Sequence, residues 1–189
     1  MMTSSHYLNN QFLIAMPNLA DANFSHTVSY LCQHNEEGAL AIVINRPTGM
    51  NLGNILEQMG INTASQQIKD TPIFAGGPVQ QERGFIIHNK GSVTWDSTIA
   101  ISDSTCLTSS RDILEAIAEG KGPELYLIAL GYAGWGEGQL EKEIISNAWL
   151  NTPYEEHILY KTPVKQRWIA AANEIGIDIS QLTAPAGHS

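Results

Sequence analysis

The feature that most constrains the fold is a series of short, strand-like apolar segments joined by connections of hairpin length. Two of them, residues 27–34 and 38–47, are separated only by the polar stretch NEE. Parallel neighbours would need a crossover of a dozen or more residues, usually a helix. Further strand-like segments occupy residues 12–16, 72–79, 83–89, 98–104, 124–130 and 157–160. The sequence therefore predicts an α+β fold with a mixed, largely antiparallel sheet and several packed helices.

Helix signals are fewer. Residues 51–60 carry apolar side chains at helical spacing, with Asn51 as the N-cap and Gly60 beyond the end. Residues 110–119 form a second predicted helix, for which Ser109 and Asp112 fit a capping box. Two more helices are predicted at residues 138–147 and 164–174, the last capped by Thr162 with Pro163 at its first position.

Composition limits the kind of protein. The 189 residues suit one domain spanning 1–189, with a flexible tail expected at 180–189. The net charge is −9, and the 10 basic residues form no run, so direct binding to duplex DNA is disfavoured. The N-terminal apolar run is too short for a signal peptide or a membrane span. We therefore expect a cytoplasmic protein without a membrane partner; the sequence leaves its oligomeric state open.

The glycine-rich segment LGYAGWGEGQLEKE, residues 130–143, resembles a phosphate-binding loop only superficially. Its glycines match neither the dinucleotide fingerprint nor the P-loop, and its acidic side chains would repel phosphate. We interpret it as a sharp turn from a core strand into a helix, anchored by Trp135. Glu137 then lies near the positive helix N-terminus, and Glu137 and Gln139 are candidates to face a cleft.

A second glycine motif, AGGPVQQERGF, spans residues 75–85. The backbone N–H groups of Gly76 and Gly77 could hold an anion, with Arg83 as a nearby guanidinium. The favoured interpretation is a β-turn, with Arg83 solvated or paired with an acid.

A third motif, NRP, ends the predicted core strand at residues 45–47. Asn45 and Arg46 are binding candidates because strand ends often border ligands. The favoured interpretation is structural: Asn45 satisfies a turn amide and Arg46 pairs with a carboxylate.

No catalytic or metal-binding set is recognisable. The six histidines lack ligand spacing, so we expect no metal and no cofactor, although distant His34 and His88 leave one alternative open. Cys32 shares a strand face with apolar residues and is expected to be buried. Cys106 precedes a predicted helix, which makes it the better nucleophile candidate.

Three motif regions together resemble the YqgE/AlgH family of small bacterial proteins. They are residues 12–49, 74–88 and 130–150, and they cover most of the chain in the family's order. The resemblance implies an α+β fold on coiled, partly barrel-like sheets and a cytosolic protein of unestablished activity. It also carries the label of putative transcriptional regulator. No basic helix-turn-helix supports direct DNA binding here.

Two functions follow as hypotheses. The leading one is a non-enzymatic binding or regulatory module with an unknown protein or small-molecule partner. Its cleft would lie between Asn45–Arg46, the Gly76–Pro78 turn and the 131–138 segment. The alternative is an enzyme for a small anionic substrate near Arg46, Arg83 and His88, in which His88 or Glu137 acts as the acid/base.

Overall fold

One curled sheet forms the centre of the protein, whose computed structural model describes residues 7–182. In order across the main path the strands are β10 (Trp149–Pro153), β1 (Gln11–Ala15), β2 (Val28–Asn35), β3 (Gly38–Val43), β9 (Tyr126–Trp135), β6 (Val79–Asn89), β8 (Thr105–Thr108) and β7 (Thr98–Ala100). Off this path, β4 (Pro47–Asn51) pairs with β5 (Pro72–Ala75). Among the described strand pairs only β5 and β9 run parallel. The predicted mixed, largely antiparallel sheet is confirmed.

The sheet is covered on both faces, because alternate residues of its strands point to opposite sides and belong to different apolar clusters. Tyr30 of β2 and Ile42 of β3 share one cluster with Leu107 of β8, which lies near the opposite edge. Strands so far apart in the sheet can share a cluster only if the sheet bends around it. This cluster is therefore the inside of a half-barrel, and the partly barrel-like shape implied by the family resemblance is confirmed. Leu31 belongs to a separate cluster on the outer face.

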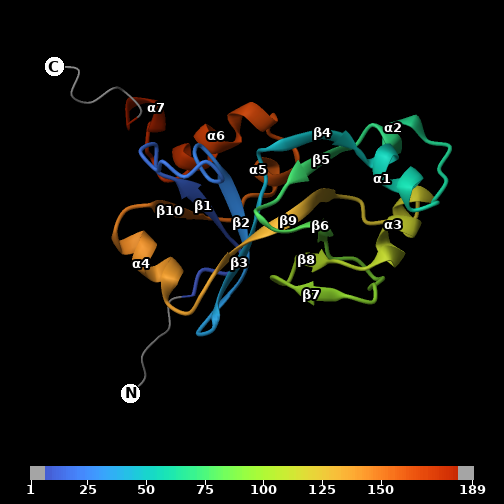
Figure 1. The fold of residues 1–189 in the computed structure, drawn as a ribbon, viewed down its shortest axis with the longest axis horizontal. Coiled ribbons are helices and arrows are strands. Elements are labelled where there is room, and N and C mark those ends of the chain that lie inside the picture. The colour runs from blue at the N-terminus through green and yellow to red at the C-terminus, as the bar shows by residue number, and fades with distance from the viewer. Residues whose placement is uncertain (1–6, 183–189) are drawn as a thin grey trace.

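The helices cover the sheet in separate groups (Figure 1). They are α1 (Leu52–Gln58), α2 (Gln66–Lys69), α3 (Arg111–Ala118), α4 (Gln139–Ile145), α5 (Glu156–Tyr160), α6 (Arg167–Asn173) and α7 (Ile179–Leu182). α1 and α3 pack on the outer face beside β5 and β6, whereas α4 packs on the outer face of β1, β2 and β3. α5 and α6 contribute Ile158 and Trp168 to the inner cluster. No helix of residues 7–182 has the length and apolar character needed to cross a membrane.

Several predicted strand boundaries were wrong. β9 does not stop at Leu130 but continues to Trp135, so the turn shrinks to residues 136–138. β3 ends at Val43, and Pro47 begins a new strand instead of ending the old one. The predicted strand 157–160 is helical and belongs to α5. β8 and β10 were not predicted, because each is too short to show clear alternation.

The helix ends test the capping predictions. Asn51 caps α1, and its side chain accepts from the Asn54 backbone in a capping box. At α3 the N-cap is Ser110, not Ser109, and no side-chain cap hydrogen bond forms. Thr162 does not cap α6; its hydroxyl donates to the His157 carbonyl. A 3₁₀ turn, Val164–Gln166, precedes α6 instead. Of the expected flexible tail, residues 180–182 fall within α7 and the remainder lies outside the described residues.

Candidate functional site

The three sequence motifs meet in a close-packed junction of backbones. Gly76 donates its N–H to the Leu130 carbonyl at 2.8 Å and accepts from the Val43 N–H at 2.9 Å. A Cβ atom at Gly76 would lie 2.4 Å from the Gly131 oxygen, and one at Gly77 would lie 2.0 Å from the Tyr132 carbonyl carbon. The glycines allow the backbones to touch here, and Asn45, Arg46, Gly76 and Gly77 line none of the hollows described below.

Asn45 and Arg46 hold the loop between β1 and β2. The Asn45 side chain accepts from the Val28 N–H and donates to the His26 carbonyl, both at 3.0 Å. The Arg46 guanidinium donates to the carbonyls of Ala22, Asn23 and Ser25 at 2.8, 2.7 and 2.7 Å. The expectation that Arg46 pairs with a carboxylate was wrong. Its planar guanidinium donates instead to three backbone carbonyls that converge at the loop turn.

The loop fixed by Arg46 brings Phe24 against two tryptophans. The Phe24 ring lies 6.2 Å from Trp135 and 5.5 Å from Trp149, measured between centroids. The Trp135 and Trp149 rings are 5.7 Å apart at 80°, an edge-to-face contact. The end of β9, the loop and β10 thus form one continuous aromatic wall.

Glu143 of α4 holds both indoles in place. Its Oε1 accepts from the Nε1–H of Trp135 and of Trp149, each at 2.9 Å. Its Oε2 accepts from Gln139 at 2.9 Å, and the Gln139 Oε1 accepts from the Gly136 N–H, which closes the turn. The sequence singled out Trp135 and Gln139, but it missed Glu143, the group that joins them.

These side chains surround a hollow of about 320 Å³ that we call the tryptophan pocket. Its lining residues are Leu19, Asp21, Phe24, Gly134, Trp135, Gln139, Glu143, Ala148 and Trp149. Two carboxylates and three aromatic rings therefore line one hollow. Glu137 is exposed on the adjoining turn and does not line this pocket.

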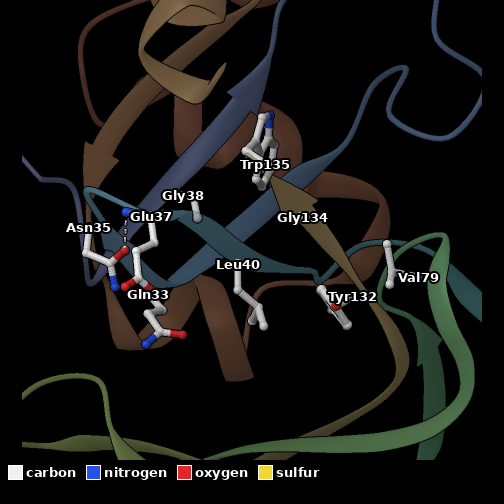
Figure 2. A pocket seen from close by; sticks show the side chains of 10 residues that line it. Gln33, Asn35, Glu37, Gly38, Leu40, Val79, Tyr132, Gly134 and Trp135 are labelled. Atoms are coloured by element: carbon white, nitrogen blue, oxygen red, sulfur yellow. Dashed lines mark hydrogen bonds between the residues drawn. The ribbon is translucent and has the colours of Figure 1, made fainter. Parts of the chain in front are cut away.

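A second hollow, the hairpin groove, is drawn in Figure 2 and shares the lining residues Gly134 and Trp135 with the tryptophan pocket. It has a volume of about 420 Å³. Its lining residues are Gln33, Asn35, Glu37, Gly38, Ala39, Leu40, Val79, Tyr132, Gly134 and Trp135. Figure 2 shows the polar Gln33, Asn35 and Glu37 grouped at the hairpin end, with Leu40 between them and Tyr132. The groove thus has a polar end and an apolar floor.

Arg83 lies in the exposed bulge of β6 and makes no ion pair with an acid among residues 7–182. Its guanidinium donates to the Ser109 hydroxyl at 3.0 Å and to Gln80 at 3.3 Å, and it lies over the Phe85 ring. It lines a further hollow of about 290 Å³, which shares Leu40 with the hairpin groove. Arg83 and Arg46 therefore belong to different surroundings and form no common anion clamp.

His88 is enclosed in β6 with 1% of its surface exposed. Its Nδ1 lies 2.9 Å from the Asn89 carbonyl, which can only accept, so Nδ1 carries a proton. Its Nε2 lies 2.7 Å from the Thr108 hydroxyl and accepts from it. In the β6–β9 pairing His88 lies opposite Tyr126, at the start of β9, whereas Glu137 lies beyond the other end of β9. Roughly 30 Å of strand separate the two positions, so the structure does not support an acid/base pair of His88 and Glu137.

Acidification should destabilise the protein partly through His88. Burial lowers the pKa of His88 from its ordinary value of 6.5, so the unfolded chain takes up the proton first. Neutral, buried His88 therefore contributes fully to the free energy of unfolding above pH 6.5. This contribution is lost as the pH falls from 6.5 towards the lower pKa of His88 in the folded state. We expect urea unfolding at pH 7.5 and 5.5 to show a smaller pH effect in His88→Gln than in the wild type. Equal pH effects in the two proteins would contradict this, and exposed His157→Gln is the control.

The cysteines offer no activated nucleophile. Cys32 is 2% exposed, as expected, and burial raises the pKa of its thiol. Cys106 lies in β8 and not before a helix, and burial raises the pKa of its thiol too. The prediction that a helix N-terminus activates Cys106 was wrong. His34 accepts from the Leu8 N–H and lies 3.2 Å from Glu141, so it does not meet His88. Residues 7–182 contain no group of three or more metal-ligating side chains.

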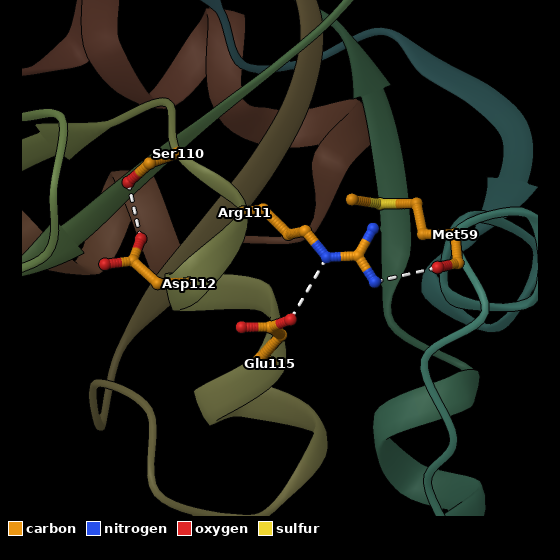
Figure 3. Close-up of polar contacts among 5 residues, drawn as sticks. All are labelled: Met59, Ser110, Arg111, Asp112 and Glu115. Carbon is orange, nitrogen blue, oxygen red and sulfur yellow. Dashed lines mark hydrogen bonds and ion pairs between the residues drawn. The ribbon is translucent and has the colours of Figure 1, made fainter.

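A more apolar hollow of about 390 Å³ lies between α1, α3 and β6. Arg111 crosses it, donating to Glu115 at 3.0 Å and to the Met59 carbonyl at 2.9 Å (Figure 3). Ser110 and Asp112 are bonded to each other beside it. These bonds tie α3 to the end of α1, which is a structural role.

Comparison with known proteins agrees with the fold. A family model described as AlgH-like matches residues 12–180. The chain is 52% identical to a UPF0301 protein of Methylococcus capsulatus and 51% identical to one of Thioalkalivibrio sulfidiphilus, with 100% of each chain covered. The solution structure of AlgH from Pseudomonas aeruginosa matches with a TM-score of 0.80 at 47% identity, over 100% of both chains. A crystal structure from Corynebacterium diphtheriae, at 16% identity and a TM-score of 0.74, covers 97% of this chain and 95% of its own and shows the fold alone. The chain therefore belongs to the AlgH-like family.

Proposed function

We propose that the protein is a non-enzymatic binding module that holds a segment of a protein partner in the hairpin groove. The observation that carries this proposal is the hairpin groove, which shares Gly134 and Trp135 with the tryptophan pocket. The groove combines an apolar floor with a polar rim, which is typical of ligand-binding sites. Its described lining residues contain no acid/base pair or activated nucleophile, which favours binding over catalysis.

Charge indicates the partner's chemistry. Glu37 lines the groove, Glu36 precedes it in the same hairpin turn, and Glu137 lies in the turn after β9. These two turns touch, because a Cβ at Gly38 would lie 3.3 Å from the Gly136 carbonyl carbon. Among the residues that the structure describes, no Lys or Arg lines the groove. A basic segment with an apolar side chain complements this surface, whereas nucleic acid does not. A regulatory role would therefore act through a protein partner, in the cytoplasm.

Selection from a random peptide library on the immobilised protein tests the proposal. We expect the selected peptides to combine Lys or Arg with an apolar residue. Glu37→Lys should weaken their binding about tenfold, because it places like charge at the rim. The matched control is Glu57→Lys on α1, since Glu57 is equally exposed but lies outside both hollows. Failure to enrich peptides above a heat-unfolded control, or equal losses in both variants, would reject the proposal.

A further inference from the structure

The tryptophan pocket combines an aromatic wall with two carboxylates. The rings of Phe24, Trp135 and Trp149 contact one another in that wall. Both indole N–H groups point to Glu143, so the polar edges of these rings are already satisfied. The three rings line the pocket, with the two indoles 7% and 3% exposed, and the negative face of an aromatic ring attracts cations.

The charge in the pocket is negative and is not neutralised by a cationic side chain. Neither Asp21 nor Glu143 is part of an ion pair among the described residues. Glu143 accepts three neutral N–H donors, and Asp21 accepts the Asn23 N–H. Neutral donors stabilise a carboxylate without cancelling its charge, so the pocket favours a cation and disfavours an anion.

The donor set also distinguishes between kinds of cation. A bare metal ion such as Ca²⁺ or Mg²⁺ needs six or more oxygen ligands in its shell. The pocket supplies carboxylates on only two residues, and both oxygens of Glu143 already accept hydrogen bonds. An organic cation with a diffuse charge needs no such shell and gains from aromatic contact. A volume of about 320 Å³ accommodates a small head group.

We infer that the tryptophan pocket binds an alkylammonium group, free or as the end of a lysine or methylated lysine side chain of a partner. This inference rests on the proposed binding function and names the group that the pocket recognises. Arg46 acts as a positioning residue, because it holds the loop that carries Asp21 and Phe24. The NRP and glycine-tryptophan motifs then serve one site from two distant parts of the chain.

Titration of the ¹⁵N-labelled full chain with choline tests this inference, with its neutral isostere 3,3-dimethylbutan-1-ol as the reference at matched ionic strength. We expect saturable shifts of the Trp135 and Trp149 indole N–H signals with choline only, while those of Trp95 and Trp168 stay fixed. Phe24→Leu should weaken choline binding about tenfold, since it removes one ring but keeps an apolar side chain. Asp21→Asn should weaken it several-fold, and Glu137→Gln, just outside the pocket, should not.

Equal shifts with the neutral isostere, shifts of all four indoles, or no shift at high choline would overturn the inference. A peptide containing trimethyllysine identifies the source of the group. Tighter binding of that peptide than of choline indicates a protein side chain, and equal binding indicates a free compound. Choline is too small to occupy the hairpin groove as well. A negative choline result therefore rejects the ammonium pocket alone, whereas a failed peptide selection rejects the protein partner.

Discussion

Replacing Gly77 with alanine should largely prevent the chain from reaching its native state. A Cβ atom there would lie 2.0 Å from the Tyr132 carbonyl carbon and 2.3 Å from the Ala133 nitrogen. These are backbone atoms of β9 at the centre of the sheet, so they cannot move aside as a flexible side chain would. The φ of Gly77, +157°, is also one that side-chain-bearing residues rarely adopt. We expect a loss of about 4 kcal/mol or more, a large part of the stability of a typical domain.

The matched control is Gly84→Ala in β6, the strand that follows the turn containing Gly77. A Cβ at Gly84 would meet no atom within 4 Å, so its stability should change by less than about 0.5 kcal/mol. Soluble yield and urea unfolding followed by circular dichroism measure both variants. A Gly77→Ala protein that unfolds at the same urea concentration as Gly84→Ala would show that the junction is looser than its geometry implies.

The same junction explains why the sequence predicted the sheet type but not the path of β9. Glycine at 131, 134 and 136 looks like a break, and isolated glycines usually mark turns. In the structure Gly131 and Gly134 remain within the strand, because Gly77 and its neighbours pack directly against this backbone. The need for close approach between segments some 50 residues apart leaves no local signal.

Helices with strong local signals were predicted well. α1 begins and ends as its Asn51 cap and Gly60 indicate, and α3 buries Ile113, Leu114 and Ile117 as their spacing predicts. α5 was misread because a run as short as HILY, residues 157–160, suits a strand or a buried helix equally. Local chemistry therefore located helices where an apolar stripe has helical spacing, with the correct cap at α1 but not at α3, and failed where only a short apolar run was present.

The candidate site was predicted only in part, for a related reason. Trp135 and Gln139 stood out because they neighbour glycines in one motif, but Glu143 and Trp149 resemble ordinary surface and core residues in the sequence. Arg46 was noticed, yet its partners were not, since backbone carbonyls are identical at every residue and leave no pattern. The partner of Arg167 could not be predicted for the same reason: this side chain is 6% exposed and donates to the Ile44 carbonyl at 2.6 Å.

Replacing Arg46 with alanine should both destabilise the protein and weaken the tryptophan pocket. Three hydrogen bonds from one charged group to Ala22, Asn23 and Ser25 would be lost. Such bonds are worth more than neutral ones, but the site is partly exposed and water can replace some of them. We therefore expect a loss of about 2 kcal/mol in the free energy of unfolding. Urea unfolding measures it, and hydrogen exchange of amides 21–27 reports on the loop.

The matched control is Arg83→Ala, because Arg83 is exposed and bonds only to two side chains. Its loss should stay below about 0.5 kcal/mol. Arg46→Lys should fall between wild type and Arg46→Ala, since a single ammonium group cannot reach three converging carbonyls as a planar guanidinium does. If Arg46→Ala loses stability and loop protection but keeps its choline response, the loop does not shape the pocket. If stability, loop protection and choline response all fall together, Arg46 supports fold and recognition through the same three carbonyls.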